Sequence, residues 1–404
     1  MTTPPVEVIA GIDTHADTHH AAVIDANGRQ LGDMQFPTTR AGYAALLGFV
    51  TSFGVVIRAG IEGTGSYGAG LSRHLRDAGM DVVEVIRPNR HIRRLRGKSD
   101  PLDAYEAART ALAEAGHPEP KTADGQVEGI RYLLVARRSA VKARTAAQVQ
   151  IKTLLITAPD QLRERFRSVT DRTLVTGLAR LRPTGGDPII MALQSLAKRH
   201  QHLTEEITEL ENALTPLVTA ANPALRAAKG VGTITAAQLL VTAGDNPERL
   251  RSEAAFAALA GASPIPASSG KTNRHRLNRG GDRQANSALH RIALVRLQHD
   301  QRTKDYAGRK LAEGRGKKEI LRCLKRAIAR EVFTLLTKPV TIPRIDDLRP
   351  LRQALGISME TVAKHFQIWP ARISDIERGK RRDDTFAQNY REWLETSNPE
   401  LDRT

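Results

Sequence analysis

The sequence predicts an α/β domain at the N-terminus followed by a mostly α-helical remainder. From Val6 to about Ala115, short β-rich runs alternate with helical segments, which is the pattern of an α/β fold. From about Val127 onward, long charged runs repeat their apolar residues at helical spacing. Since the chain has 404 residues, it can form about two to four domains of ordinary size, each with its own core.

The first part of the chain predicts a three-stranded meander and then helix–strand units. The Asn27-Gly28 pair is a hairpin signal, and Gly79 is expected to close a helix. The expected elements are strands over 6–13, 19–25 and 28–36, a helix over 41–53, a strand over 55–62, a helix over 65–79 and a strand over 81–86. Three antiparallel strands followed by such units suit a ribonuclease-H-like sheet.

Two long helical runs, 131–156 and 188–218, predict a helical hairpin. The second run favours a coiled-coil arm or an interchain bundle, with a monomeric bundle as the alternative. Its apolar residues at helical spacing are Leu193, Leu196, Leu203, Ile207 and Leu210. After Pro223, the segment Gly230–Gly232 separates two helical stretches and resembles a helix-hairpin-helix, which either contacts a phosphate or serves packing alone.

The charge balance favours a polyanionic partner. Lysine and arginine number 61 against 44 acidic residues, which gives a net charge of +17 and a pI near 10.3. Nucleic acid is the leading candidate because basic side chains release counterions from phosphates. The alternative is a generally arginine-rich protein from a GC-rich genome. Aromatic residues make up only 4%, which argues against broad base-stacking platforms.

The sequence also predicts where the protein resides. Cys323 is the sole cysteine, so no intrachain disulfide and no thiolate metal cluster can form within one chain. The first residues lack a basic segment with a following apolar core, and no stretch approaches the roughly 20 apolar residues that span a bilayer. We therefore expect a cytoplasmic protein with no membrane partner.

Four carboxylates stand where they can hold a cation. Asp13 ends the first strand, and Glu62 ends a buried strand, where an ionised carboxylate is costly without a partner. Asp100 and Asp103 share one face at a helix start, where capping is the ordinary role for either residue. Together the four supply the oxygen ligands that Mg²⁺ prefers. His15 follows nearby, and for it we favour an exposed or packing role over metal or phosphate binding.

A basic segment directly precedes the aspartate pair. Its cations are Arg87, Arg90, Arg93, Arg94, Arg96 and Lys98. A solvated run of charge is the usual explanation for such a segment. Because this segment adjoins the carboxylate cluster, we favour a nucleic-acid backbone that passes between the basic segment and the carboxylates.

These motifs resemble a known family. GIDTH, IEGTGSYG and KSDPLDA look like the DEDD signature of bacterial insertion-sequence transposases that have an N-terminal RuvC-like domain. That family includes bridge-RNA-guided recombinases and is related to the Piv-type DNA invertases. Residues 256–294 resemble its C-terminal transposase domain with a serine-glycine motif. The resemblance covers most of residues 6–338.

The resemblance implies that Ser269, just before Gly270, is the catalytic serine, with Ser268 as a neighbouring competitor. Taken alone, a serine in such a Gly/Pro-rich loop is usually a turn residue. The basic surroundings favour a nucleophile, since cations can neutralise a phosphodiester. The cations expected to do so are Lys271, Arg274, Arg276, Arg279 and Arg283.

The resemblance further implies transesterification of DNA. Ser269 would form a phosphoserine link that a DNA hydroxyl later resolves, with Mg²⁺ held by the four acids. The implied partners are double-stranded DNA at element ends and target, a structured guide RNA encoded by the element, and further copies of the chain in a dimer or tetramer. The implied location is the nucleoid. A non-catalytic DNA-binding regulator and a RuvC-like endonuclease that cuts with water are the alternatives.

The C-terminal segment resembles a Cro/repressor-type helix-turn-helix. Ser358 is expected to cap one helix, and residues 370–379 to form a recognition helix ending at Gly379, with Arg372 and Ser374 toward the groove. A packing module without DNA contact is the alternative. The predicted domains are a RuvC-like domain (1–115), a helical coiled-coil region (116–222), a serine transposase domain (223–340) and the helix-turn-helix (345–404).

Overall fold

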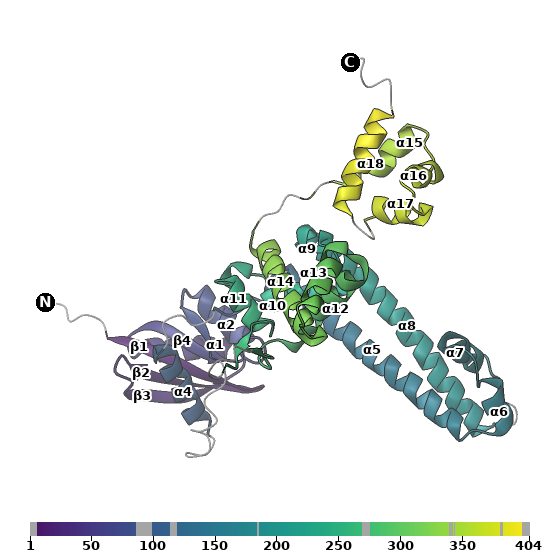
Figure 1. The fold of residues 1–404 in the computed structure, drawn as a ribbon. Coiled ribbons are helices and arrows are strands. Elements are labelled where there is room, and N and C mark those ends of the chain that lie inside the picture. The colour runs from purple at the N-terminus through teal and green to yellow at the C-terminus, as the bar shows by residue number, and fades with distance from the viewer. Residues whose placement is uncertain are drawn as a thin grey trace. The chain divides into compact units, whose positions relative to one another are not determined.

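The computed structural model in Figure 1 describes residues 6–85, 99–113, 119–183, 186–268, 275–338, 342, 344–379 and 383–397. The chain divides into two compact units, residues 1–125 with 243–249, and residues 126–242 with 250–404. The first unit is built on a mixed sheet and the second is mostly helical, which confirms the predicted fold class. None of the helices in the described residues has the length and apolar character needed to cross a membrane.

The sheet of the first unit has five strands among the described residues. They are β1 (Glu7–Thr14), β2 (Thr18–Asp25), β3 (Gln30–Pro37), β4 (Val55–Glu62) and β5 (Val82–Val85), in the order β3-β2-β1-β4-β5. β1, β2 and β3 form the predicted antiparallel meander, while β4 and β5 run parallel to β1 and to each other. Each strand lies within two residues of its predicted range, and Gly28 takes the positive φ of 81° that its hairpin turn requires.

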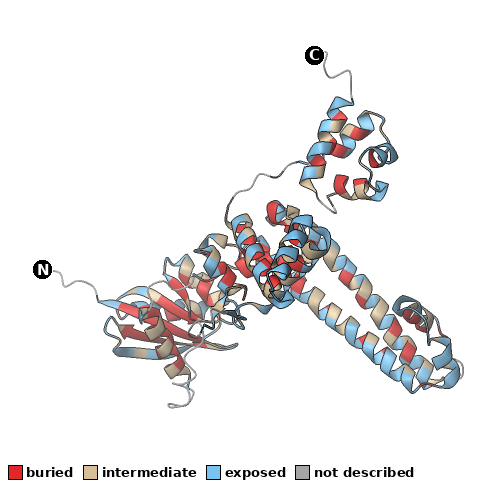
Figure 2. Ribbon diagram, viewed as in Figure 1, coloured by how far each residue is buried: buried red, intermediate tan, exposed pale blue. Residues whose placement is uncertain are grey.

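Helices cover both faces of this sheet. On one face α1 (Arg40–Thr51) and α2 (Ala69–Asp77) bury a core that includes Ile12, Leu46 and Leu71. On the other face α4 (Asp100–Ala113) packs on residues such as Ile9 and Ile24. Because side chains alternate along a strand, the odd-numbered residues of β1 face α4. Figure 2 shows buried residues along the strands of this sheet.

Two glycines let α4 lie directly on the sheet. A Cβ added to Gly11 of β1 would stand 2.1 Å from the backbone nitrogen of Ala108 and 2.2 Å from the carbonyl oxygen of Ala104. A Cβ on Gly60 of β4 would stand 2.8 Å from the carbonyl oxygen of Ala107. Backbone atoms of a packed helix cannot give way as a flexible side chain can. Any larger residue at these positions must therefore lift α4 off the sheet.

Gly11→Ala is expected to destabilise the first unit by about 3 kcal/mol or more, since overpacking costs about 1–3 kcal/mol even where side chains can move. Urea unfolding of the full chain followed by far-UV circular dichroism measures the effect. Gly48→Ala is the matched control, because a Cβ at this exposed position of α1 meets nothing within 4 Å. The control should stabilise α1 by up to about 1 kcal/mol. Equal stability of the two variants would contradict the packing described here.

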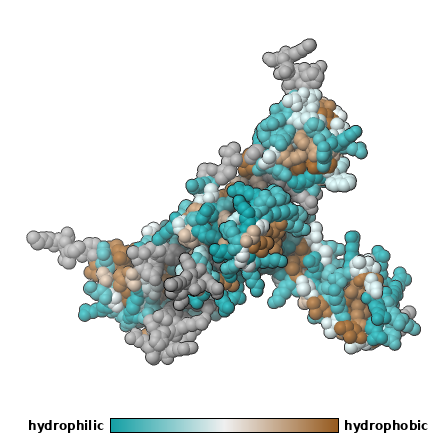
Figure 3. All heavy atoms as spheres, in the orientation of Figure 1, coloured by the Kyte–Doolittle hydropathy of each residue, from teal (hydrophilic) through white to brown (hydrophobic). Residues whose placement is uncertain are grey.

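A helical arm dominates the second unit. α5 (Gln126–Ile156) and α8 (Pro188–Ala221) lie side by side, as the sequence predicts, with α6 (Asp160–Arg165) and α7 (Asp171–Ala179) near the tip (Figure 1). Leu203 and Ile207 of α8 pack with Ala140 of α5, so the apolar seam is covered within the chain. Apolar residues remain exposed near the tip, where Figure 3 shows hydrophobic surface; they include Leu154, Ile156 and Met191.

After the arm, the second unit contains further helices and a small two-stranded ribbon. They are α9 (Pro223–Ala227), α10 (Thr233–Ala243), α11 (Glu253–Leu259), α12 (Arg283–His299), α13 (Gln301–Ala312) and α14 (Lys317–Thr337), and the ribbon pairs β6 (Ile265–Pro266) with β7 (His275–Arg276). Gly230, between α9 and α10, has a φ of +77°, as the predicted glycine turn requires. Phe256, Leu289 and Ile328 are among the residues buried here.

The C-terminal segment has a core of its own. The helices of this segment are α15 (Leu348–Ala354), α16 (Met359–His365), α17 (Pro370–Glu377) and α18 (Asp384–Thr396). The Ser358 hydroxyl accepts a hydrogen bond of 3.0 Å from the Thr361 amide, which confirms the predicted cap. Gly379 has a φ of +64° just after α17, where the sequence predicts the helix to end.

A buried ion pair joins α15 to α17. The Arg352 guanidinium donates to both oxygens of Glu377, at 2.6 and 3.1 Å, and the Tyr390 hydroxyl donates to Glu377 at 3.0 Å. Burial, and then the neighbouring Glu377 charge, raise the pKa of Tyr390, so the phenol remains a donor. Arg352 and Glu377 are only 7% and 8% exposed. Removing either charge would leave its partner buried and uncompensated.

Glu377→Leu is therefore expected to destabilise this segment by about 3–5 kcal/mol. Both tryptophans of the chain, Trp369 and Trp393, lie in this segment, so tryptophan fluorescence during urea unfolding reports on it selectively. The control is Asp346→Ala, which removes an exposed ion pair with Arg344 and should change stability by less than about 1 kcal/mol. A fluorescence transition that Glu377→Leu leaves in place would contradict the structural role given to the buried pair.

Candidate active site

The end of β1 and the start of α4 bring two of the predicted acids together. Gly11 faces α4, and Asp13, two residues further along the strand, points to the same side. Ala104 packs over Gly11, and Asp100 precedes it by about one helical turn. Asp13, which is 5% exposed, therefore lies beside the first residue of α4.

His15 completes this cluster. Its Nε2 lies 3.2 Å from Oδ2 of Asp13 and 3.4 Å from Oδ1 of Asp100. One ligand atom from each of the three residues lies within 4.8 Å of the others. The sequence did not predict these contacts of His15, whose side chain is 41% exposed, and a metal role for this residue stays a prediction. Two carboxylates and an imidazole form a donor set that suits a divalent cation.

Glu62 and Asp103 stand on neighbouring elements but are not part of that close group of described residues. Gly60 faces Ala107 of α4, so Glu62, two residues on, is placed toward the same face of the sheet. Asp103 is 5% exposed and lies about one turn before Ala107. The Thr14 hydroxyl donates to the carbonyl oxygen of Glu62 at 2.8 Å and ties the ends of β1 and β4 together.

A second polar cluster holds the first turns of α4. The Tyr105 hydroxyl donates to Oδ1 of Asp33 on β3 at 3.0 Å, and Nε2 of His20 on β2 lies 2.7 Å from Oδ2 of Asp33. Burial, and then the hydrogen bond to Asp33, raise the pKa of Tyr105 to about 12, so it stays protonated and donating. This contact fixes the helix that carries Asp100 and Asp103.

The predicted serine segment is described only in part. Ser269, Lys271 and Arg274 lie outside the described residues, as does the basic run from Arg87 to Lys98. Ser268 is exposed after β6, whose Pro266 pairs with His275 of β7. The described cations of this region are exposed, and they are Arg276, Arg279 and Arg283.

The segment from Arg279 to Arg283 is fixed by a cap. Asp282 accepts hydrogen bonds from the backbone of Gln284 at 2.7 Å and Ala285 at 3.2 Å, which caps α12. Its other oxygen accepts from the Thr242 hydroxyl at 2.7 Å. Arg283, the first residue of α12, is thus presented from a fixed helix end.

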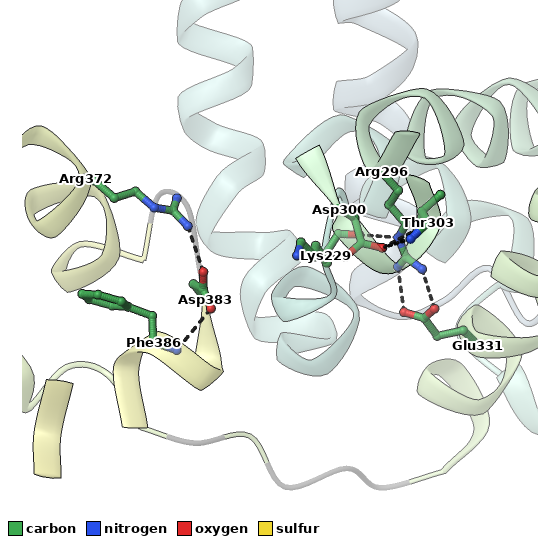
Figure 4. A network of polar contacts seen from close by, with 8 residues as sticks. All are labelled: Lys229, Arg296, Asp300, Thr303, Glu331, Arg372, Asp383 and Phe386. Atoms are coloured by element: carbon green, nitrogen blue, oxygen red, sulfur yellow. Dashed lines mark hydrogen bonds and ion pairs between the residues drawn. The ribbon is translucent and has the colours of Figure 1, made fainter. Parts of the chain in front are cut away.

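Polar contacts also hold the glycine turn and the C-terminal helices (Figure 4). Lys229 pairs with Asp300 at 2.9 Å, while Arg296 donates to the carbonyl oxygen of Lys229 and pairs with Glu331. In the C-terminal segment, Nη2 of Arg372 lies 3.1 Å from Oδ2 of Asp383. The predicted DNA contact of Arg372 stays a prediction.

Comparisons with known proteins agree with these observations. A model of the DEDD-type transposases of IS110 elements, described as a transposase, matches residues 10–158, and a model described as the transposase of the IS116/IS110/IS902 family matches residues 222–308. A 43.6 kDa protein of insertion element IS110 from Streptomyces coelicolor is 24% identical in an alignment 395 positions long, which covers 83% of this chain and 95% of the relative. The first match contains Asp13, Glu62, Asp100 and Asp103, and the second contains Ser269. The chain therefore belongs to the IS110 family of DEDD-type DNA transposases, the family that its motifs resemble.

Proposed function

We propose that this transposase cuts and rejoins DNA through a phosphoserine at Ser269, assisted by Mg²⁺ on Asp13, Glu62, Asp100 and Asp103. The observation that best supports the proposal is the cluster of Asp13, His15 and Asp100 within 4.8 Å. Like charges so close together are costly unless a cation offsets them. The DEDD family suggests a divalent cation, and a bound cation would act as a Lewis acid on a phosphate oxygen.

The proposed reaction conserves the number of phosphodiester bonds. The Ser269 oxygen forms a bond to phosphorus while the scissile P–O bond breaks, and the leaving DNA oxygen takes up a proton. A hydroxyl group of another DNA strand then attacks the same phosphorus and releases the serine. Arg276, Arg279 and Arg283 follow Ser269 closely in the sequence, and their charge would offset that of the phosphate.

Trapping the covalent adduct tests this mechanism. The full chain is incubated with nicked DNA of an element end and Mg²⁺, denatured, and analysed for a protein–DNA species by gel electrophoresis and mass spectrometry. A phosphoserine at position 269 is the expected product. DNA that is cut without any adduct would favour the water-using endonuclease. Binding with neither cut nor adduct would favour a non-catalytic regulator.

We also infer that a guide RNA and further copies of the chain take part. The net charge of +17 and the family resemblance support the RNA, while the exposed apolar residues near the tip of the arm support assembly into a dimer or tetramer. Sequencing of RNA that copurifies with the chain and mass photometry at nanomolar concentration test the two parts separately. A monomer free of RNA that still recombines DNA would contradict both.

A second proposed function belongs to residues 345–404, which lie beyond both family models. Helices α16 and α17 are joined by only residues 366–369, as in a helix-turn-helix, and Trp369, just before α17, is 83% exposed. We propose that α17 contacts bases of duplex DNA through Arg372. Of the four predicted domains, the first would then bind the cation and the helical region would act as a spacer. The third would carry the serine, and the fourth would recognise DNA.

Arg372→Ala is expected to lower the affinity for a selected DNA sequence by about 10-fold or more, because a good base contact contributes about 1–3 kcal/mol of discrimination. Arg349→Ala on α15 is the matched control, since it removes an exposed arginine of the same segment. Selection from random DNA followed by fluorescence anisotropy supplies both the sequence and the affinity. If neither variant loses selectivity for the DNA sequence, residues 345–404 form a packing module without DNA contact.

A further inference from the structure

A cavity of about 860 Å³ lies in the second unit, beside the β6–β7 ribbon. One wall is the ribbon with Arg276, and the others are the end of α13 and the side of α14 that carries Arg322 and Arg326. Its volume falls in the range of about 300–1,000 Å³ that is usual for ligand pockets. The two family models end at residues 158 and 308, so neither includes α14.

The cavity is strongly basic. Among the described residues that line it, seven are arginine or lysine and two are glutamate. The cations are Arg276, Lys310, Arg315, Arg322, Lys325, Arg326 and Arg330, and the acids are Glu313 and Glu319. Such an excess of one charge around a concave surface concentrates field lines and favours an anion.

Contacts inside the protein neutralise only part of this charge. Lys310 pairs with Glu313 at 2.7 Å, and Glu253 accepts from both Arg326 and Arg330, at 2.9 and 2.6 Å. The described part of the chain offers no ion pair to three further cations of the lining, which are Arg276, Arg315 and Arg322. Several guanidinium groups thus remain available for an outside partner.

Two buried groups of the lining also lack a full set of acceptors. Nη1 of Arg326 is buried and has no hydrogen-bond partner in the described residues. Lys325 is only 7% exposed, and burial, followed by the charge of Arg322, lowers the pKa of its ammonium group. Its described hydrogen bond goes to a neutral amide, Oδ1 of Asn286, at 2.9 Å. A bound anion would supply the missing acceptors and charge.

The walls of the cavity are held in place before any ligand binds. The Asn286 amide donates to the carbonyl oxygens of Ala260 and Gly261, at 3.0 and 2.8 Å, while its oxygen accepts from Lys325. Asn286 therefore links α12, α14 and the turn that leads into β6. Such a preformed site loses little conformational entropy on binding.

We propose that this cavity binds the sugar–phosphate backbone of a single nucleic-acid strand. A cavity of this size admits a few nucleotides, whereas a duplex must lie across the surface. Leu277, 47% exposed, and Tyr306 line the same cavity and offer apolar contact to a sugar or base. The inference deepens the proposed function, because strand exchange at Ser269 requires that an unpaired strand be held near the β6–β7 ribbon.

The test measures binding of single strands by the full chain carrying both Arg315→Glu and Arg322→Glu. Fluorescence anisotropy is recorded with a DNA oligonucleotide, an RNA of the same sequence and the duplex DNA, over a salt series. We expect the double variant to bind at least one single strand about 10-fold or more weakly, with a salt slope reduced by about 0.7 per lost contact, and to bind the duplex within about 2-fold of wild type. The strand type that loses affinity identifies the ligand as DNA or RNA.

The chain carrying both Arg302→Glu and Lys304→Glu is the matched control, since it makes the same change of charge on two exposed residues of α13 outside the lining. It should bind all three ligands nearly as wild type does, and circular dichroism should show the same helical content for every variant. Photocrosslinking of thiouridine-labelled or thiothymidine-labelled strands is expected to map to residues 306–330. Unchanged single-strand binding, or equal losses for single strands and duplex, would overturn the proposal.

This experiment separates the cavity from the chemistry. Ser269→Ala should bind single strands as wild type does, because the cavity does not depend on a nucleophile. If single-strand binding depends on Arg322 but the chain forms no DNA adduct, the proposal for the cavity stands. The phosphoserine mechanism is then contradicted. If the double variant binds single strands as wild type does and forms the adduct normally, the proposal for the cavity is contradicted. The phosphoserine mechanism is then unaffected.

Discussion

Ser269→Ala is expected to abolish the covalent protein–DNA link and to lower recombination by at least ~10⁴-fold, since removing a serine nucleophile costs that much or more in enzymes that depend on one. The physical reason is that alanine has no oxygen to form the bond to phosphorus. The measurement is adduct formation on nicked DNA together with a plasmid recombination assay. DNA binding by the variant should stay within about 2-fold of wild type, because a single hydroxyl adds little to backbone binding.

Ser268→Ala is the control, because it removes a hydroxyl from the neighbouring position in the same segment. It should form the adduct at a rate within about 3-fold of wild type if Ser269 is the nucleophile. The reverse result, with Ser268→Ala inactive and Ser269→Ala active, would move the nucleophile by one residue. Full activity of both variants would indicate that water cuts the DNA.

Local sequence patterns sufficed for the sheet of the first unit and for the helix ends of the C-terminal segment. Alternating apolar runs placed the strands, and the Asn27-Gly28 turn with its short connections set the order of the meander. The helix ends followed from residues such as Ser358 and Gly379, whose roles depend on neighbours one turn away. These features are readable because each depends on contacts between residues close together in the sequence.

Contacts between distant segments could not be predicted in this way. His15 lies in the turn after β1, and only the packing of α4 brings Asp100 to it. The cavity depends on residues of β7, α13 and α14 that share no motif. The seam of α8, with its heptad-like leucines, equally fits a partner in the same chain or another chain, and the structure shows Ala140 of α5 packed there.

The two glycines opposite α4 explain why the acids can be close at all. Gly11 and Gly60 remove the side chains that would separate α4 from β1 and β4. Asp13 and Glu62 each follow one of these glycines by two residues, so both project toward the start of the same helix. The glycines of the GID and AGIE segments therefore belong to the candidate site as much as the acids do, although they carry no chemistry.

Asp13→Asn is expected to lower recombination by at least ~10³-fold, because the Lewis acidity of a bound cation contributes several kcal/mol to the transition state. The substitution keeps the size of the side chain and removes one negative charge from the cluster with Asp100. Divalent-cation binding by the full chain, followed by Mn²⁺ paramagnetic resonance, should weaken in parallel. This second measurement separates loss of the cation from loss of the fold.

His15→Gln tests the nitrogen donor of the same cluster, with an expected loss of about 10–100-fold in Mn²⁺ affinity. Asp17→Asn is the control for both substitutions, since it removes one charge from an exposed residue two positions beyond His15. It should leave cation binding and recombination unchanged. If Asp13→Asn bound Mn²⁺ and recombined DNA as the control does, the cluster at the end of β1 would hold no catalytic cation, and the carboxylates would serve only the packing of α4.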